Sequence, residues 1–193
     1  MKKGLTIVIS GPSGVGKGTV IAELMKQNPE FMISISTTTR NPRPGDVPNE
    51  TYYFVEKEDF LKSIENNEFA EWAVVHNNYY GTKKSFINHC MKSQNTLILE
   101  IDIQGAEKIR QKFAKKEVEG KLISIFITPP SEAELLKRIE LRGSDSKENI
   151  QVRMQNAKLE LKEKDKFDFI VVNNIVKETC QEINRIIQKE LEK

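Results

Sequence analysis

The sequence predicts an α/β fold in which helices cover both faces of a central parallel β-sheet. Short runs rich in Ile, Val, Leu and Phe recur along the 193 residues, and segments with helical spacing of apolar residues lie between or after them. Near-continuous apolar runs are typical of strands buried on both faces, and strands that alternate with helices favour right-handed crossovers. A chain of this length can bury one good core with insertions, so we expect a single domain.

The expected elements follow from these patterns. The strands are predicted at Leu5–Ser10, Phe31–Ser36, Thr96–Asp102, Lys121–Thr128 and Phe167–Asn173. The helices are predicted at Lys17–Gln27, Ile103–Phe113, Ser131–Leu141 and Lys177–Leu191, the last with a clear apolar face. We assign them to a core of residues 1–36, 84–130 and 167–193, together with one helix of the segment 131–166.

The first strand leads directly into a glycine-rich turn and a helix. The turn reads Gly11-Pro12-Ser13-Gly14-Val15-Gly16-Lys17-Gly18-Thr19. Glycines let a backbone wrap closely around an anion, the helix N-terminus adds partial positive charge, and Lys17 supplies an ammonium for outer phosphates. The whole turn, called the glycine loop below, is therefore predicted to bind the phosphates of a nucleotide.

The hydroxyl that usually follows the loop lysine and holds magnesium is displaced by one position. Gly18 follows Lys17, and the first hydroxyl belongs to Thr19. A Gly-Lys-Gly-Thr ending resembles nucleoside monophosphate kinases more than GTPases or motor ATPases. Thr19 is therefore one hypothesis for a metal ligand, directly or through water.

Two stretches break the alternation of strands and helices. Residues 37–83 hold several prolines and then three short aromatic segments around a short helix. The aromatic segments are Tyr52–Val55, Phe69–Val75 and Tyr79–Tyr80, and the helix is predicted at Asp59–Asn66. We expect a small β-rich insertion there, at the carboxyl edge of the sheet. Residues 131–166 combine a helix with the highly charged segment Gly143–Lys166, which is expected to form a mobile flap.

A second anion site is predicted after Phe31–Ser36. Arg40 and Arg43 lie three residues apart in a loop stiffened by prolines, so they can present two guanidinium groups to one phosphate. Tyr52 and Tyr80 can add phenolic donors. Without the other motifs, the same loop is also compatible with a solvated surface loop, and the two tyrosines are also compatible with packing in the core of the insertion.

A base-reading pair is predicted in the same insertion. Glu71 stands beside Trp72, and Thr82 follows the turn Asn78-Tyr79-Tyr80-Gly81. A carboxylate accepts two parallel hydrogen bonds from N1–H and the 2-amino group of guanine, whereas adenine offers no such donor pair. Taken alone, Glu71 would be interpreted as a surface charge.

Together these motifs resemble the guanylate kinase family in order and spacing, over almost the whole chain. The shared motifs are the glycine loop, Ser36–Gly45, Glu71-Trp72, Asn78-Tyr79-Tyr80-Gly81, Glu100-Ile101-Asp102-Ile103-Gln104-Gly105, Arg142-Gly143 and Arg153. The resemblance implies a three-layer P-loop kinase fold with a central parallel sheet, an inserted β-rich GMP-binding subdomain and a helical lid. It also implies transfer of the ATP γ-phosphoryl group to GMP, giving ADP and GDP, with Mg²⁺.

The resemblance further implies roles for single residues. The GMP phosphate would be bound by Arg40, Arg43, Tyr52 and Tyr80. The guanine would be read or supported by Ser36, Glu71, Thr82 and Asp102. The transferring phosphoryl group would be contacted by Lys17, Arg43, Arg142 and Arg153, with Arg138 assisting or holding the lid. Asn173 falls where the family contacts the adenine of ATP. Glu100 is the second metal-ligand hypothesis, with Asp102 as its alternative.

Composition limits the partners. The 30 basic and 28 acidic residues nearly balance, so no overall field favours nucleic acid or a membrane surface. Cys90 and Cys180 lie far apart, which argues against a disulfide framework or zinc site and fits a reducing compartment. We therefore expect a cytoplasmic protein that binds ATP and GMP, without an obligate protein partner. His76 and His89 are expected to be structural or exposed.

Two other functions stay open. A non-catalytic guanylate-kinase-like domain uses the same fold to bind phosphopeptides, but Lys17, Arg142 and Arg153 favour catalysis. A kinase for another nucleoside monophosphate would share the glycine loop, and here Glu71 with Thr82 favours guanine.

Overall fold

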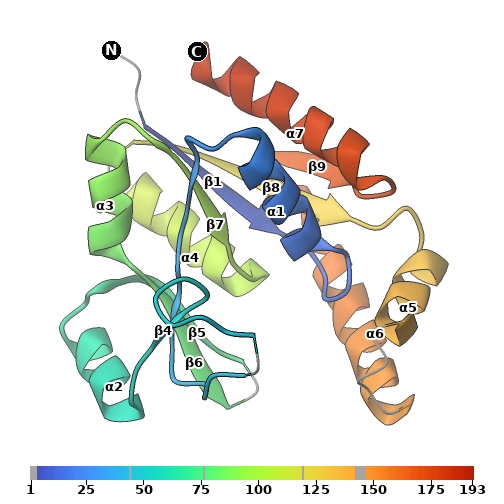
Figure 1. The fold of residues 1–193 in the computed structure, drawn as a ribbon, viewed down its shortest axis with the longest axis horizontal. Coiled ribbons are helices and arrows are strands. Elements are labelled where there is room, and N and C mark those ends of the chain that lie inside the picture. Colours follow the sequence, from blue (N-terminus) through green and yellow to red (C-terminus); the bar gives the residue numbers. More distant parts are fainter. Residues whose placement is uncertain (1–3, 44, 76, 119, 142–146) are drawn as a thin grey trace.

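The computed structural model describes residues 4–43, 45–75, 77–118, 120–141 and 147–193. In these ranges the strands form two sheets (Figure 1). The first is wholly parallel, in the order β2-β7-β1-β8-β9. Its strands are β1 (Leu5–Ser10), β2 (Met32–Ile33), β7 (Thr96–Glu100), β8 (Lys121–Thr128) and β9 (Phe169–Val172). The predicted central parallel sheet is confirmed.

Neighbouring residues of the central strands face two different cores. In β1, Ile7 and Ile9 belong to one apolar cluster and Val8 belongs to the other. The first cluster lies under α1 (Lys17–Gln27) and α7 (Val176–Leu191), and the second under α3 (Lys84–Lys92) and α4 (Ile103–Ala114) (Figure 1). Because both faces are covered, the strands carry apolar residues at most positions, as the sequence pattern indicated.

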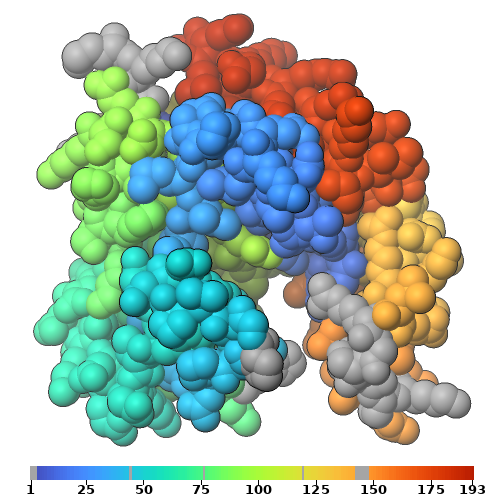
Figure 2. All heavy atoms as spheres, in the orientation of Figure 1, coloured from blue at the N-terminus to red at the C-terminus, as the bar shows by residue number. Residues whose placement is uncertain are grey.

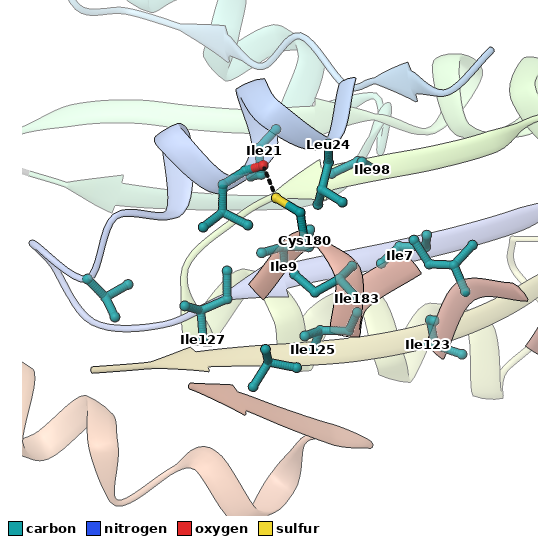
Figure 3. Packing of buried hydrophobic residues seen from close by; sticks show 14 of the residues in the cluster. Ile7, Ile9, Ile21, Leu24, Ile98, Ile123, Ile125, Ile127, Cys180 and Ile183 are labelled. Carbon is teal, nitrogen blue, oxygen red and sulfur yellow. Dashed lines mark hydrogen bonds between the residues drawn. The ribbon is translucent and has the colours of Figure 1, made fainter. Parts of the chain in front are cut away.

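Figure 3 shows how the first cluster packs. Isoleucines of β1 and β8 lie against the apolar faces of the two covering helices. The labelled members include Ile7, Ile9, Ile123, Ile125, Ile127, Ile21, Leu24 and Ile183. The Cys180 thiol donates to the Val20 carbonyl oxygen at 3.5 Å, and both cysteines are buried and free. The cysteines thus lie in the packing, which agrees with the expectation that they form no disulfide.

Residues within 37–83 build the second sheet, in the order β4-β3-β6-β5. Its strands are β3 (Thr37–Thr38), β4 (Tyr53–Phe54), β5 (Phe69–Val75) and β6 (Asn78–Lys83). The helix α2 (Lys57–Glu65) covers it through Phe60, whose ring stacks on Phe69 with 4.4 Å between centroids. The aromatic residues of this segment therefore form a small core of their own, as expected for a β-rich insertion.

The secondary-structure prediction differs from the structure at several element ends, and three differences bear on the site or the core. The strand expected over Phe31–Ser36 is limited to Met32–Ile33, because the chain leaves the central sheet after Ser34 and joins the second sheet. The strand expected to reach Asp102 ends at Glu100, because Asp102 caps α4. The helix α3 was not expected, although its apolar residues pack on the core.

The segment 131–166 carries α5 (Glu132–Leu141) and α6 (Lys147–Leu161), followed by a short 3-10 turn at Lys164–Lys166. The charged flap is therefore mostly helical in its described part. Figure 2 shows a notch between the lobe of the second sheet and the lobe of α5 and α6. Among the described helices, none is long and apolar enough to cross a membrane.

A pair of leucine substitutions tests the packing. Leu24 on α1 is 0% exposed and Leu159 on α6 is 60% exposed. Leu24→Ala leaves a cavity in the first cluster, so it should lower the free energy of unfolding by about 2–5 kcal/mol. Leu159→Ala should change it by no more than about 0.5 kcal/mol. Urea denaturation measures both, and equal losses at the two positions would contradict the packing described here.

Candidate functional site

The glycine loop turns between β1 and α1, where the sequence placed it. Gly16 precedes α1 with φ of +94°, and a Cβ on it would lie 2.8 Å from Nδ2 of Asn173. A Cβ on Gly11 would lie 2.3 Å from the carbonyl oxygen of Ile127. Only glycine fits at these two positions, so the loop can press against the core and leave its other side to a ligand.

Polar groups of the glycine loop form hydrogen bonds with other groups of the chain. The Lys17 ammonium donates to the carbonyl oxygens of Gly11 at 2.5 Å and Pro12 at 3.2 Å. The Ser13 N–H donates to Oε2 of Glu160, which reaches over from α6, at 3.2 Å. Burial raises the pKa of Glu160, and the Ser13 N–H and Lys17 oppose that rise. A carboxylate of the chain thus takes an N–H that the loop would offer to a phosphate.

A cleft of about 390 Å³ joins the glycine loop to the second sheet. Its lining comes from the loop, the chain after β2, the insertion, the end of β7 and α6. The polar lining residues include Lys17, Ser36, Tyr52, Glu100, Asp102 and Glu160. The cleft lies beyond the carboxyl ends of the central strands, where open α/β sheets bind ligands. It brings residues predicted for the donor side and for the acceptor side to one place.

The predicted acceptor-phosphate residues gather around Tyr52. The Arg40 guanidinium carbon lies 5.2 Å from the Tyr52 ring centroid, and the Tyr80 ring packs edge-on to Tyr52 at 5.9 Å. Arg40 is also ion-paired with Asp46 at 2.8 Å, and the Arg43 N–H donates to the same carboxylate at 2.6 Å. These two contacts, the Arg43 N–H first, lower the pKa of Asp46. The Arg43 side chain itself is exposed.

Glu71 and Thr82 face each other across β5 and β6. They are paired residues of that antiparallel ladder, and the Thr82 hydroxyl donates to Oε1 of Glu71 at 2.7 Å. Glu71 is only 6% exposed. Burial raises the pKa of Glu71 to about 7, helped by the charge of Asp102 and opposed by Thr82 and Lys108. The insertion therefore holds a buried carboxylate, which lines a separate hollow of about 190 Å³ together with Trp72 and Lys108.

Two acids close the carboxyl end of β7. Asp102 accepts the Gly105 N–H at 2.7 Å and so caps α4. Glu100 lines the cleft, and partial loss of solvent raises its pKa while the Lys17 ammonium lowers it. Both carboxylates line the cleft. Asp102 lies beyond the last residue of β7, so the turn into α4 places its side chain there.

The two metal-ligand hypotheses lie in different hollows. Thr19 is exposed and lines a hollow of about 350 Å³ on the other side of the loop, with Arg138 and Asn173. Among the described residues no group of three or more His, Cys, Asp or Glu side chains is placed to hold a metal. Mg²⁺ in such sites is commonly held by one or two carboxylates with substrate phosphates and water. Glu100 and Asp102 fit an ion of that kind.

Asn173 fixes the glycine loop to the rest of the protein. Its Nδ2 donates to the Val15 carbonyl oxygen at 2.8 Å, and its Oδ1 accepts from Thr179 of α7 at 3.1 Å. Arg138 of α5 donates to the carbonyl oxygens of Asn173 at 2.9 Å and Val15 at 3.3 Å, and pairs with Glu134 at 3.0 Å. Arg138 thus holds α5 against the loop, and the side-chain amide of Asn173 is engaged within the protein.

Of the two arginines predicted for the lid, only Arg153 lies within the described residues. Arg142 lies outside the described residues, as does His76. Arg153 is half-buried on α6, about two turns before Glu160, so both side chains belong to one side of that helix. His89 lies on α3, which contributes no residue to the described lining of the cleft.

Sequence reasoning missed two acids of this site, Glu160 and Asp46. The spacing of seven residues between Arg153 and Glu160 was a usable signal once α6 was assumed to be a helix. The sequence gives no such signal for Asp46, because its contacts with Arg40 and the Arg43 N–H depend on how the loop folds back.

Comparison with known proteins agrees with this geometry. A family model described as Guanylate kinase matches residues 3–190. A protein named guanylate kinase from Prochlorococcus marinus subsp. pastoris is 44% identical over 182 residues, which span 94% of this chain and 96% of that protein. One from Caldanaerobacter subterraneus subsp. tengcongensis is 45% identical over 186 residues, or 96% and 87% of the two chains.

A solved structure gives the same result for the fold. The crystal structure of guanylate kinase from Anaplasma phagocytophilum aligns with a TM-score of 0.80 at 31% identity, covering 100% of this chain and 88% of that one. Sequence and fold agree over nearly the full length, and the chain belongs to the guanylate kinase family.

Proposed function

We propose that this protein transfers the γ-phosphoryl group of ATP to GMP, giving ADP and GDP. The observation that carries the proposal is the single cleft in which the glycine loop with Lys17 meets Ser36 and Tyr52 of the acceptor side. The buried Glu71–Thr82 pair of the insertion supports guanine as the base. The family relationship supports the same activity.

ATP would bind with its phosphates on the glycine loop. Its phosphate oxygens replace Glu160 at the Ser13 N–H, and the Lys17 ammonium leaves the Gly11 and Pro12 carbonyl oxygens for the β- and γ-phosphates. The hollow beside Asn173 would take the adenosine part. Lys17 thus exchanges two neutral acceptors for charged ones, which strengthens its hydrogen bonds.

GMP would bind in the insertion. The guanine N1–H and 2-amino group donate to the carboxylate of Glu71, with Ser36, Thr82 and Asp102 around them. The GMP phosphate is bound by the cluster around Tyr52, whose members are Arg40, Arg43 and Tyr80. The phosphate competes with Asp46 for Arg40, so the arginine is already oriented before the substrate arrives.

The transfer step needs positive charge more than it needs a base. Charge spreads over the oxygens of the moving group, and the attacking GMP oxygen is already ionised. We assign the stabilisation of that charge to Lys17, Arg43, Arg142 and Arg153. Mg²⁺ held by Glu100 or Asp102, directly or through water, would neutralise part of the phosphate charge.

This assignment divides the chain by role. Residues 37–83 form the GMP-binding insert, residues 131–166 form the lid, and the remainder forms the core. Arginines from lid and insert meet only when the notch closes, which also keeps water from the γ-phosphoryl group. We also propose a cytoplasmic location and no nucleic-acid, membrane or obligate protein partner.

A panel of acceptors tests the function. ADP release from ATP should be fast with GMP and dGMP and slow with AMP, CMP, UMP and dTMP, because only guanine offers the donor pair that Glu71 accepts. A coupled spectrophotometric assay measures each rate. Preference for another nucleotide would refute the base assignment. Absence of turnover with all six acceptors would favour the interaction-domain alternative.

Replacing the loop lysine tests its catalytic role. Lys17→Met should lower kcat about 100-fold or more, because the ammonium stabilises charge that develops on the moving phosphoryl group. Lys26→Met, on the exposed side of the same helix, is the matched control and should leave kcat unchanged. An unchanged kcat in Lys17→Met, in steady-state assays at saturating substrates, would remove Lys17 from the mechanism.

The pH dependence of GMP binding tests Glu71. Glu71→Gln should cost about 1–3 kcal/mol of GMP affinity and leave ATP affinity unchanged. In the wild type, GMP affinity should fall as the pH drops below about 7, because protonation removes the acceptor that guanine needs. Calorimetric titration from pH 5.5 to 8.5 measures both effects.

Two comparisons complete that test. The titration of the GMP phosphate, with a second pKa near 6, acts on both variants equally, so their difference isolates Glu71. Glu68→Gln, which removes a surface partner of Lys83, should behave as the wild type. Parallel pH profiles for the wild type and Glu71→Gln would show that Glu71 does not read the base.

A further inference from the structure

The first turn of α4 contains a buried glycine whose missing side chain faces the base-reading carboxylate. A Cβ on Gly105 would lie 2.9 Å from Oε2 of Glu71, 3.4 Å from its Cδ and 3.2 Å from Oδ1 of Asp102. Real Cβ atoms essentially never approach another heavy atom within 3.0 Å. The three atoms nearest to that position thus belong to two acids of the site, and none belongs to the backbone.

The backbone of Gly105 does not explain why glycine is there. The residue lies inside α4 and has no positive φ. Its N–H donates to Asp102, as the N–H of any non-proline residue could. Glycine is less favourable than alanine within a helix, so the empty space has a cost for folding. We therefore explain the glycine by the neighbouring Glu71 carboxylate, which lies too close to leave room for a side chain at residue 105.

The Glu71 carboxylate is held on one side by a hydrogen bond and borders a hollow of about 190 Å³ that Trp72 and Lys108 also line. Its Oε1 accepts the hydroxyl of Thr82, which is fully buried. Lys108, one turn further along α4, donates to the Trp72 carbonyl oxygen and lies 4.7 Å from the Trp72 ring centroid. A methyl group on residue 105 would thus meet the end of a flexible side chain, and the carboxylate would turn away from it toward the hollow.

We propose that Gly105 is a specificity-determining residue for the acceptor base: the absence of its side chain lets the Glu71 carboxylate stand where it accepts both guanine donors. This inference rests on the proposed function. Gly105 acts through Glu71 and does not touch the reacting atoms, so it is a positioning residue. The two parallel hydrogen bonds to guanine require both carboxylate oxygens in one plane with the base, which makes them sensitive to a turn of the group.

The variant Gly105→Ala tests the proposal in the full-length enzyme. It should raise the KM for GMP at least tenfold, with kcat and the KM for ATP within twofold of the wild type. Its melting temperature should be equal or higher, because alanine favours the helix. Gln104→Ala, an exposed change in the same helical turn, is the control for a general disturbance of α4 and should leave the KM for GMP unchanged.

A second variant separates positioning from damage. Glu71→Asp withdraws the carboxylate by one methylene group. Alone it should raise the KM for GMP, but combined with Gly105→Ala it should lower the KM at least threefold relative to Gly105→Ala, because the shorter acid leaves room for the methyl group. The sign change between the two backgrounds is the signature of a steric relation.

The outcomes are distinct. An unchanged KM for GMP in Gly105→Ala, an equal rise in both KM values, or additive losses in the double variant would each overturn the inference. A lowered melting temperature would also overturn it, since it would assign Gly105 to helix packing. These results leave the proposed function intact as long as the wild type prefers GMP. A wild type without that preference would refute the function itself.

Discussion

The site depends on hydrogen-bond donors and cations that face negatively charged groups beyond the carboxyl ends of the central strands. Two groups of donors that we assign to substrate phosphates lie there, and each of them contacts a carboxylate of the chain. Glu160 accepts the Ser13 N–H of the glycine loop, and Asp46 accepts from Arg40 and the Arg43 N–H. Each substrate phosphate would meet donors that are already oriented by an internal acid, so little reorganisation remains for the bound complex.

The fold supplies this arrangement through its two cores. Apolar strands covered on both faces make a rigid sheet, and its loops converge at one edge. Tight packing of Gly11 and Gly16 against Ile127 and Asn173 fixes the glycine loop on that edge. The insertion carries its own small aromatic core around Phe60 and Phe69, so it can hold the acceptor site as a separate body. The residues that we assign to the two substrates then lie on the two sides of a notch (Figure 2).

Features set by nearby residues were predictable from the sequence. The glycine loop follows from adjacent residues, and the pairing of Glu71 with Thr82 follows from two strands joined by a short turn. Features that depend on contacts between residues far apart in the sequence could not be predicted. The strand after Phe31 ends early because the chain crosses from there to the second sheet. The helix α3 is short and therefore shows only a few apolar residues in helical spacing. The contacts of Glu160 and Asp46 form only when α6 lies against the glycine loop and when the loop around Asp46 folds back onto Arg40. Asn173 lines the hollow that we propose for the adenosine, and the contacts of its amide with Val15 and Thr179 were not predicted.

The central claim is that the two groups of phosphate donors face each other across one cleft. The most direct measurement is a crystal structure with GMP and a non-hydrolysable ATP analogue bound together. The account predicts that the γ-phosphorus lies in line with an oxygen of the GMP phosphate, with the ammonium of Lys17 on the phosphates between them. Phosphates that point away from each other, with both nucleotides fully bound, would contradict it.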